Sequence, residues 1–166
     1  MKRRTFIKKN AIVTLAPFIT TGLFARNKKI KSLSEKPFQL NYAPHFGMFE
    51  SMAGKDLMDQ IQFMHDQGFR SLEDNGMKNR SKKTQNDIAK KMEKLGMSMG
   101  VFVGHKIYWK EPNLTSGDKS LQDEFVENIR DSVEVAKRVN ATWMTIVPGH
   151  IDLKKEMDYQ TANVIE

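Results

Sequence analysis

The fold is decided by residues 55–74, which read KDLMDQIQFMHDQGFRSLED. Three apolar residues recur at the i, i+4, i+7 spacing of one buried helix face: Leu57, Ile61 and Met64. Gly68 can adopt the left-handed conformation that ends a helix without steric cost, and an apolar segment follows it directly. The stretch therefore predicts a helix at residues 55–67 that leads straight into a short strand at residues 69–74.

The same helix–strand unit recurs along the chain. A second helix opens at Thr84, with Asp87 in the position of a capping box, and Gly96 closes it. A longer helix ends at Asn140, which also tolerates the left-handed cap. The apolar stripes of these two helices are Ile88, Met92 and Leu95, and then Phe125, Ile129, Val133 and Ala136. In all, we expect strands at residues 38–45, 69–74, 97–104 and 141–147, and helices at 55–67, 84–95, 121–139 and from 158 onward.

This alternation of strands and helices is typical of parallel βαβ units, so the predicted fold class is α/β. A closed (β/α)8 TIM barrel needs about 250 residues, so residues 37–166 fit only its first four β/α units. The chain stops inside a predicted helix, and we therefore expect a fragment of a longer reading frame; pairing of two copies as a homo-oligomer is the alternative. A doubly wound open sheet is the competing architecture, although no G-x-G-x-x-G follows the first strand.

Residues 1–36 form a separate leader. Arg3-Arg4-Thr5-Phe6-Ile7-Lys8 matches the twin-arginine export pattern, and an apolar run at residues 11–25 follows. The run is too short and too interrupted for a bilayer span. We expect export by the twin-arginine route to the periplasm; an uncleaved membrane anchor is the alternative.

The positive charge of the chain belongs to this leader. Residues 1–36 hold ten of the 27 Lys and Arg and one of the 20 Asp and Glu, so the rest of the chain carries 17 basic and 19 acidic side chains. A nucleic-acid-binding surface should place its basic stripe on the folded body. We therefore expect no nucleic-acid partner. The chain contains no Cys, which excludes disulfides and thiolate metal sites.

Polar residues gather at the predicted ends of the strands. His45, His105 and His150 lie at or just past such ends, and Glu73 and Asp74 close the second strand. Active sites of α/β barrels are built on this rim. These five residues are the candidate substrate-binding set, and Glu73 leads it because a carboxylate that ends a buried strand needs a partner. No H-E-x-x-H, P-loop or nucleophile elbow is present.

Four short segments carry a resemblance to a known family: Asn41-Tyr-Ala-Pro44, the run Gly68-Phe-Arg-Ser-Leu-Glu-Asp-Asn75, Gly100-Val-Phe-Val-Gly104 and Met144-Thr-Ile-Val-Pro-Gly149. Over residues 38–166 the chain resembles the hydroxypyruvate isomerase-like members of the xylose isomerase-like TIM barrels. The resemblance implies a metal-dependent isomerase or epimerase that acts on a small sugar or hydroxy-carbonyl substrate. It also implies a divalent cation (Mg, Mn or Zn) whose ligands come from strands beyond this chain.

The function expected from the resemblance is that of an exported sugar or hydroxy-acid isomerase whose present portion is inactive alone. Glu73 and His105 match only supporting positions that face substrate. The alternative is a non-catalytic exported carbohydrate-binding protein on the same barrel. A DNA-repair endonuclease of the barrel superfamily is disfavoured by the leader and by the acidic body.

Overall fold

The computed structural model describes residues 36–166. All but the last residue of the predicted export leader lies outside the described part, so the leader stays a prediction. No helix between residues 36 and 166 combines the length and the apolar character needed to cross a bilayer.

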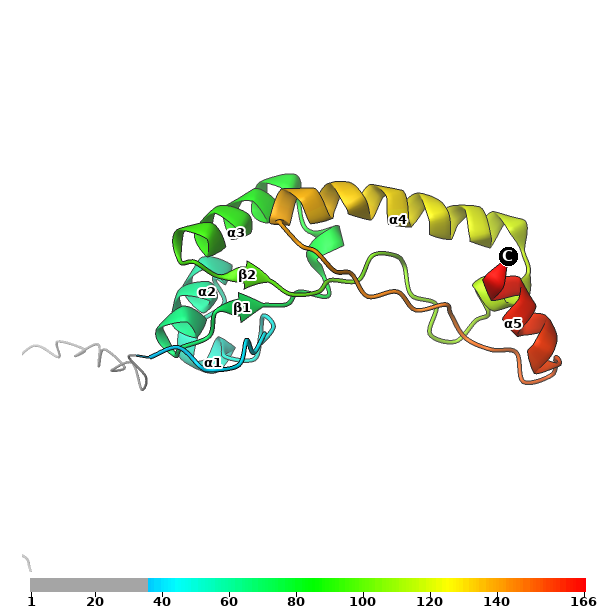
Figure 1. Cartoon of the computed structure of the whole chain (residues 1–166), viewed down its shortest axis with the longest axis horizontal. Coiled ribbons are helices and arrows are strands. Elements are labelled where there is room, and N and C mark those ends of the chain that lie inside the picture. The colour runs from blue at the N-terminus through cyan, green and yellow to red at the C-terminus, as the bar shows by residue number, and fades with distance from the viewer. Residues whose placement is uncertain (1–35) are drawn as a thin grey trace, which may run out of the picture. The chain divides into compact units, whose positions relative to one another are not determined.

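Helices dominate the described residues. They are α1 (Glu50–Ala53), α2 (Leu57–Asp66), α3 (Lys82–Lys94), α4 (Lys119–Val139) and α5 (Met157–Ile165), with single 3-10 turns η1 (Met77–Asn79) and η2 (Leu114–Ser116). Two strands, β1 (Ser71–Leu72) and β2 (Ser98–Met99), pair in parallel. Figure 1 shows α3 and α4 along one side of the strand segments, and α5 near the start of α4.

Side-chain caps begin the three longest helices. Asp56 accepts hydrogen bonds from two backbone N–H groups of α2, Ser81 accepts from Thr84 in α3, and Asp118 accepts from Ser120 in α4. The four predicted helices are confirmed, with ends within a few residues of those expected. The predicted cap of α3 is wrong by three residues, because Ser81 rather than Thr84 caps it.

The prediction of the first four units of a (β/α)8 barrel is wrong. Within residues 36–166 only β1 and β2 form a sheet, and they are the two strands of a single βαβ unit around α3. The first and fourth predicted strands contribute isolated parallel bridges, His45 with Glu73 and Val103 with Thr145. The described chain is thus a helical layer over a minimal parallel ribbon.

The reason lies in the spacing of buried side chains along the third predicted strand. Met97, Met99 and Phe102 are buried, whereas Val101 is only half-buried. A strand repeats every two residues, so the step of three from Met99 to Phe102 breaks the alternation. Regular pairing ends at Met99, and the Asp74 N–H then donates to the Val101 carbonyl at 3.1 Å, outside the regular register. The first predicted strand contains Pro44, which has no N–H to donate to a ladder.

The hydrophobic core lies between the helices and the ribbon. Its fully buried side chains come from α2, η1 and α3 and from the strand segments: Ile61, Met64, Leu72, Met77, Ile88 and Phe102. In α4 the buried face is Ser132, Val135 and Val139, and the predicted stripe residue Val133 is 41% exposed. The stripe was misplaced because Ser132 is polar; its hydroxyl is buried and donates to the Gly104 carbonyl at 2.5 Å.

Polar contacts fix α5 in place: Gln160 bonds the loop that precedes the helix, and Asn163 bonds η2. Gln160 is buried and donates to the carbonyls of Asp152 and Lys155 at 3.0 and 3.1 Å. Asn163 donates to the Thr115 carbonyl at 3.0 Å. No residue of α5 belongs to the main core cluster among the described residues.

Candidate functional site

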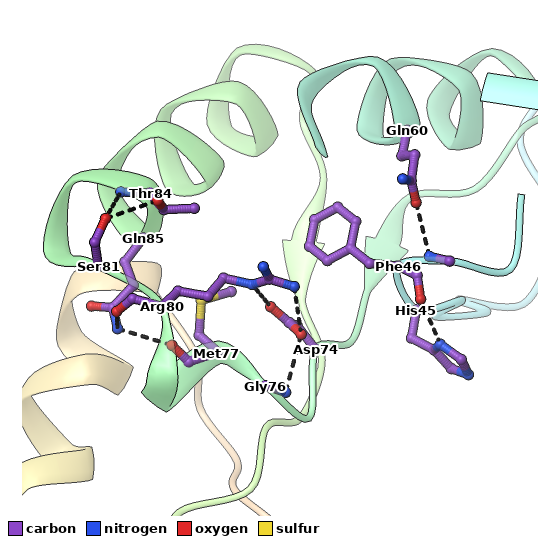
Figure 2. A network of polar contacts seen from close by, with 11 residues as sticks. His45, Phe46, Gln60, Asp74, Gly76, Met77, Arg80, Ser81, Thr84 and Gln85 are labelled. Carbon is purple, nitrogen blue, oxygen red and sulfur yellow. Dashed lines mark hydrogen bonds and ion pairs between the residues drawn. The ribbon is translucent and has the colours of Figure 1, made fainter. Parts of the chain in front are cut away.

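The loop that follows β1 is fixed by a buried ion pair. The Asp74 carboxylate accepts from Arg80 Nε at 2.5 Å and Nη2 at 3.2 Å, and from the backbone N–H of Gly76 at 3.1 Å. The guanidinium also lies over the Phe46 ring, 5.0 Å from its centroid, which adds a cation–π contact. Figure 2 shows Arg80 reaching from the end of η1 back to Asp74, so the loop is closed at both ends.

Buried amides hold the same loop to α3. Gln85 Nε2 donates to the carbonyls of Met77 and Arg80 at 2.9 and 3.0 Å, and Gln85 Oε1 accepts from Arg138 of α4. Every polar atom of this amide therefore has a use in the fold. Loop 74–80, which we call the platform, is therefore held by hydrogen bonds within itself and to α3.

Lys78 joins this platform to α4. Its Nζ donates to the Asn128 carbonyl at 2.7 Å, to Asn128 Oδ1 at 2.8 Å and to the Gly104 carbonyl at 3.3 Å. Burial of the ammonium lowers the pKa of Lys78, against a smaller opposite effect of the Asp131 charge. Lys78 therefore places a half-buried positive charge in this wall, with three acceptors for its three protons.

A hollow of about 620 Å³ opens beside Lys78. Its wall comes from the loop after β1, the segment after β2, the fourth strand segment and the middle of α4. These are the carboxyl ends of the strand segments, where ligands of α/β proteins bind. Its volume falls within the range of small-molecule sites.

The polar groups of the hollow fall into two sets. In the first set, Lys78, Asn128 and His105, the side chains already make hydrogen bonds within the protein. Asn128 Nδ2, for example, also donates to the Glu124 carbonyl at 2.8 Å. A second set makes no hydrogen bond through its side chains within residues 36–166: the amides of Asn75 and Asn79, the Thr145 hydroxyl and the Trp109 indole. Trp109 is 74% exposed. The hollow thus combines polar groups bonded within the protein with exposed polar groups that make no side-chain hydrogen bond among residues 36–166.

The charge at the hollow is positive. Lys78 and Lys106 line it, and no Asp or Glu does. A hydrogen bond to Tyr108 at 2.8 Å and the nearby Glu124 charge raise the pKa of Lys106, and Tyr108 in turn donates to Glu124 at 2.6 Å. The Glu124 carboxylate, 3.8 Å from Lys106 Nζ, offsets part of the Lys106 charge, whereas no carboxylate contacts Lys78 within the described residues.

Of the predicted site residues, only His105 lines the hollow. Its Nε2 accepts the Val147 N–H at 2.8 Å, so Nδ1 carries the proton and donates to the Lys106 carbonyl at 2.8 Å. Its ring also packs on Phe125, with centroids 4.7 Å apart. His105 is therefore a buried brace between two strand segments, with both ring nitrogens in use.

The other four predicted residues lie outside the hollow. His45 is exposed and its Nδ1 contacts the Phe46 carbonyl at 3.0 Å, and its ring lies apart from Asp74 (Figure 2). Glu73 is half-buried beside His45, and within the described residues its carboxylate makes no hydrogen bond or ion pair. The Asp74 carboxylate accepts hydrogen bonds from Arg80 and from the Gly76 N–H. His150 is exposed, beside Pro112.

Sequence reasoning missed Lys78 and the three Asn residues of the hollow. Asn75, Lys78 and Asn79 follow β1 immediately, the station at which carboxylates were sought. The sequence feature that could have identified these three residues is the cluster of polar side chains at a strand end. Asn128 gave no such signal, because it lies in the middle of α4.

The implied divalent cation does not fit these residues. Among residues 36–166 no three His, Asp or Glu side chains lie close enough together to hold a metal ion, and the hollow offers amides and cations instead of carboxylates. No family model matches the sequence, and no curated protein is significantly similar to it. The isomerase-like resemblance stays a prediction.

Proposed function

We propose that the hollow beside Lys78 binds a small sugar or hydroxy acid. The observation that carries this proposal is the pair of unused amides, Asn75 and Asn79, with the Thr145 hydroxyl and the Trp109 indole on a wall whose other polar groups are already engaged. Neutral amides donate and accept at once, which suits hydroxyl groups. The indole offers an apolar face for the C–H side of a sugar ring.

The positive field of the hollow favours a ligand that carries a carboxylate as well as hydroxyls. Lys78 has no proton left to donate, so it acts through its charge rather than through a direct hydrogen bond. A charge in a partly buried wall is less screened by water than a surface charge. A hydroxy acid is therefore expected to bind more tightly than a neutral sugar of the same size.

Proton transfer on the bound molecule would need a base at the hollow. No Asp or Glu lines it, and both nitrogens of His105 are engaged. We therefore propose binding without isomerisation for residues 36–166. Export of this binding protein rests on the leader motif alone and is tested by fractionation of cells that express the whole chain.

Calorimetric titration of the whole chain with glycerate, xylose and propionate tests the proposal. Glycerate and xylose should bind, glycerate more tightly, and propionate, which lacks hydroxyls, should not. Trp109→Ala should weaken binding by about fivefold or more, the factor that corresponds to one aromatic stacking contact of about 1 kcal/mol. The matched control is Trp143→Ala, because Trp143 is 72% exposed and lies outside the hollow. An equal loss in both variants, or tight binding of propionate, would reject the hollow as the site.

A further inference from the structure

Asn75 and Gly76 form the only Asn–Gly pair in the sequence. In such a pair the backbone nitrogen of the glycine can attack the side-chain amide carbon of the asparagine. A bond forms between Gly76 N and Asn75 Cγ, and ammonia leaves with the amide nitrogen. Water then opens the resulting succinimide to aspartate or isoaspartate. Glycine favours this reaction because it carries no side chain to hinder the attack and leaves its backbone free to rotate.

Both reacting residues are exposed in the loop after β1. The Asn75 amide makes no hydrogen bond within residues 36–166 and lines the hollow. Water and a hydroxide base can therefore reach the side chain and the peptide bond. The electrophile of the reaction is unprotected.

The nucleophile, the backbone nitrogen of Gly76, is in contrast held in place by a hydrogen bond. The Gly76 N–H donates to Asp74 Oδ1 at 3.1 Å, and Asp74 is buried and fixed by Arg80. The attack requires the Gly76 nitrogen to lose its proton and turn toward Asn75 Cγ. A neighbouring carboxylate that accepts this N–H opposes both changes, because it stabilises the protonated amide and fixes its direction.

We infer that Asn75–Gly76 is a self-modification site whose rate is set by the Asp74 carboxylate. The reaction adds one negative charge to the wall shared with Lys78. In the isoaspartate product it also lengthens the main chain between β1 and η1. The inference does not depend on what the hollow binds.

The experiment follows ammonia release and the mass gain of about 1 Da that replaces an amide by a carboxyl. Intact-protein and peptide mass spectrometry would be applied to the whole chain during incubation at mildly alkaline pH. The rate is compared between folded protein and protein unfolded in urea, and between wild type, Asp74→Ala and Asp74→Asn. Gly76→Ala is the matched control: Gly76 has φ −89° and the added Cβ would meet only Asp74 Oδ1, at 3.5 Å. We expect that variant to fold and to hinder the attack.

Modification should be confined to Asn75 and should be slowed about tenfold in folded wild type relative to the unfolded chain, the factor worth one charge-assisted hydrogen bond. Asp74→Ala should restore most of that rate, whereas Asp74→Asn, which keeps an acceptor for the Gly76 N–H, should restore less. If Asp74→Ala does not fold, the inference is still tested by the modification rate of folded Asp74→Asn and by the ratio of the folded to the unfolded rate in wild type. Equal rates in folded and unfolded wild type, or equal rates in folded wild type and a folded Asp74→Ala, would overturn the inference.

Discussion

Replacing Arg80 by Met should destabilise the fold because it leaves the Asp74 carboxylate buried with a single donor. The side chain of Asp74 is 6% exposed and that of Arg80 is 25% exposed, with Nε and Oδ2 2.5 Å apart. Removal of one partner from a buried ion pair costs about 3–5 kcal/mol. We expect the lower end, about 3 kcal/mol, because Arg80 itself is partly hydrated and the Gly76 N–H still bonds the carboxylate. That loss is a large part of the stability of an ordinary domain.

The control for this prediction is an ion pair of similar length that lies on the surface. Lys83 Nζ and Asp87 Oδ2 are 2.6 Å apart on α3, with side chains 87% and 42% exposed. Lys83→Met should leave the urea midpoint unchanged within error, because exposed pairs contribute little. Both variants would be unfolded in urea and followed by far-UV circular dichroism, with equal slopes required. The reasoning would be refuted if the two variants shifted the midpoint by the same amount.

Three further predictions concern backbone strain, packing and pH. Gly149→Ala should lower the melting temperature more than Gly47→Ala, since both have positive φ but only Gly149 would press a Cβ against Asn113, at 2.8 Å; equal shifts would reject the clash. Phe102→Ala should cost about 3–5 kcal/mol in urea unfolding, because the ring is fully buried; a loss below about 1 kcal/mol would place the ring outside the core. The third uses the pKa of Lys78, which burial lowers below 10.5. Between its folded and unfolded pKa values the unfolded chain binds more protons, so the stability of wild type relative to Lys78→Met should rise with pH there. Urea midpoints at about pH 7 and about pH 10.5 check this, and a constant difference would contradict it.

The helices could be predicted from sequence because their signals are local. The apolar spacing of Ile61 and Met64 and the left-handed caps at Gly96 and Asn140 act within a few residues. Asn140, at φ 54°, is the one non-glycine residue with positive φ between residues 36 and 166, and asparagine tolerates that conformation better than most side chains.

The strands could not be predicted, because a ladder depends on two segments at once. Apolar runs such as residues 97–104 satisfy the pattern of a buried strand, but pairing also needs a partner in register and an unbroken alternation. Phe102 turns toward the helices one residue too late for that alternation, and sequence alone does not reveal which of two adjacent apolar residues will be buried. Strand segments therefore lie side by side in parallel, with few ladder bonds between them.

Of the five predicted site residues only His105 lines the candidate hollow. Strand ends do surround the hollow, and His105 lies in it, yet the search favoured His, Asp and Glu because these residues carry most catalytic chemistry. Asp74 illustrates the difficulty, because its carboxylate, at a strand end, accepts hydrogen bonds from the Gly76 N–H of the turn and from Arg80, six residues away. Only the folded arrangement distinguishes such a structural partner from a ligand.

The attachment of α5 has a consequence for how the chain opens in its native state. Asn163 of α5 donates to the Thr115 carbonyl in η2, whereas Gln160 bonds only the loop just before the helix. The apolar residues Met157 and Ile165 of α5 are 53% and 79% exposed. Regions with few buried apolar contacts open at a lower free energy than the whole domain. Amide protons of residues 157–165 should therefore exchange with deuterium through a local opening, whereas those of α2 and α3 should exchange only through global unfolding.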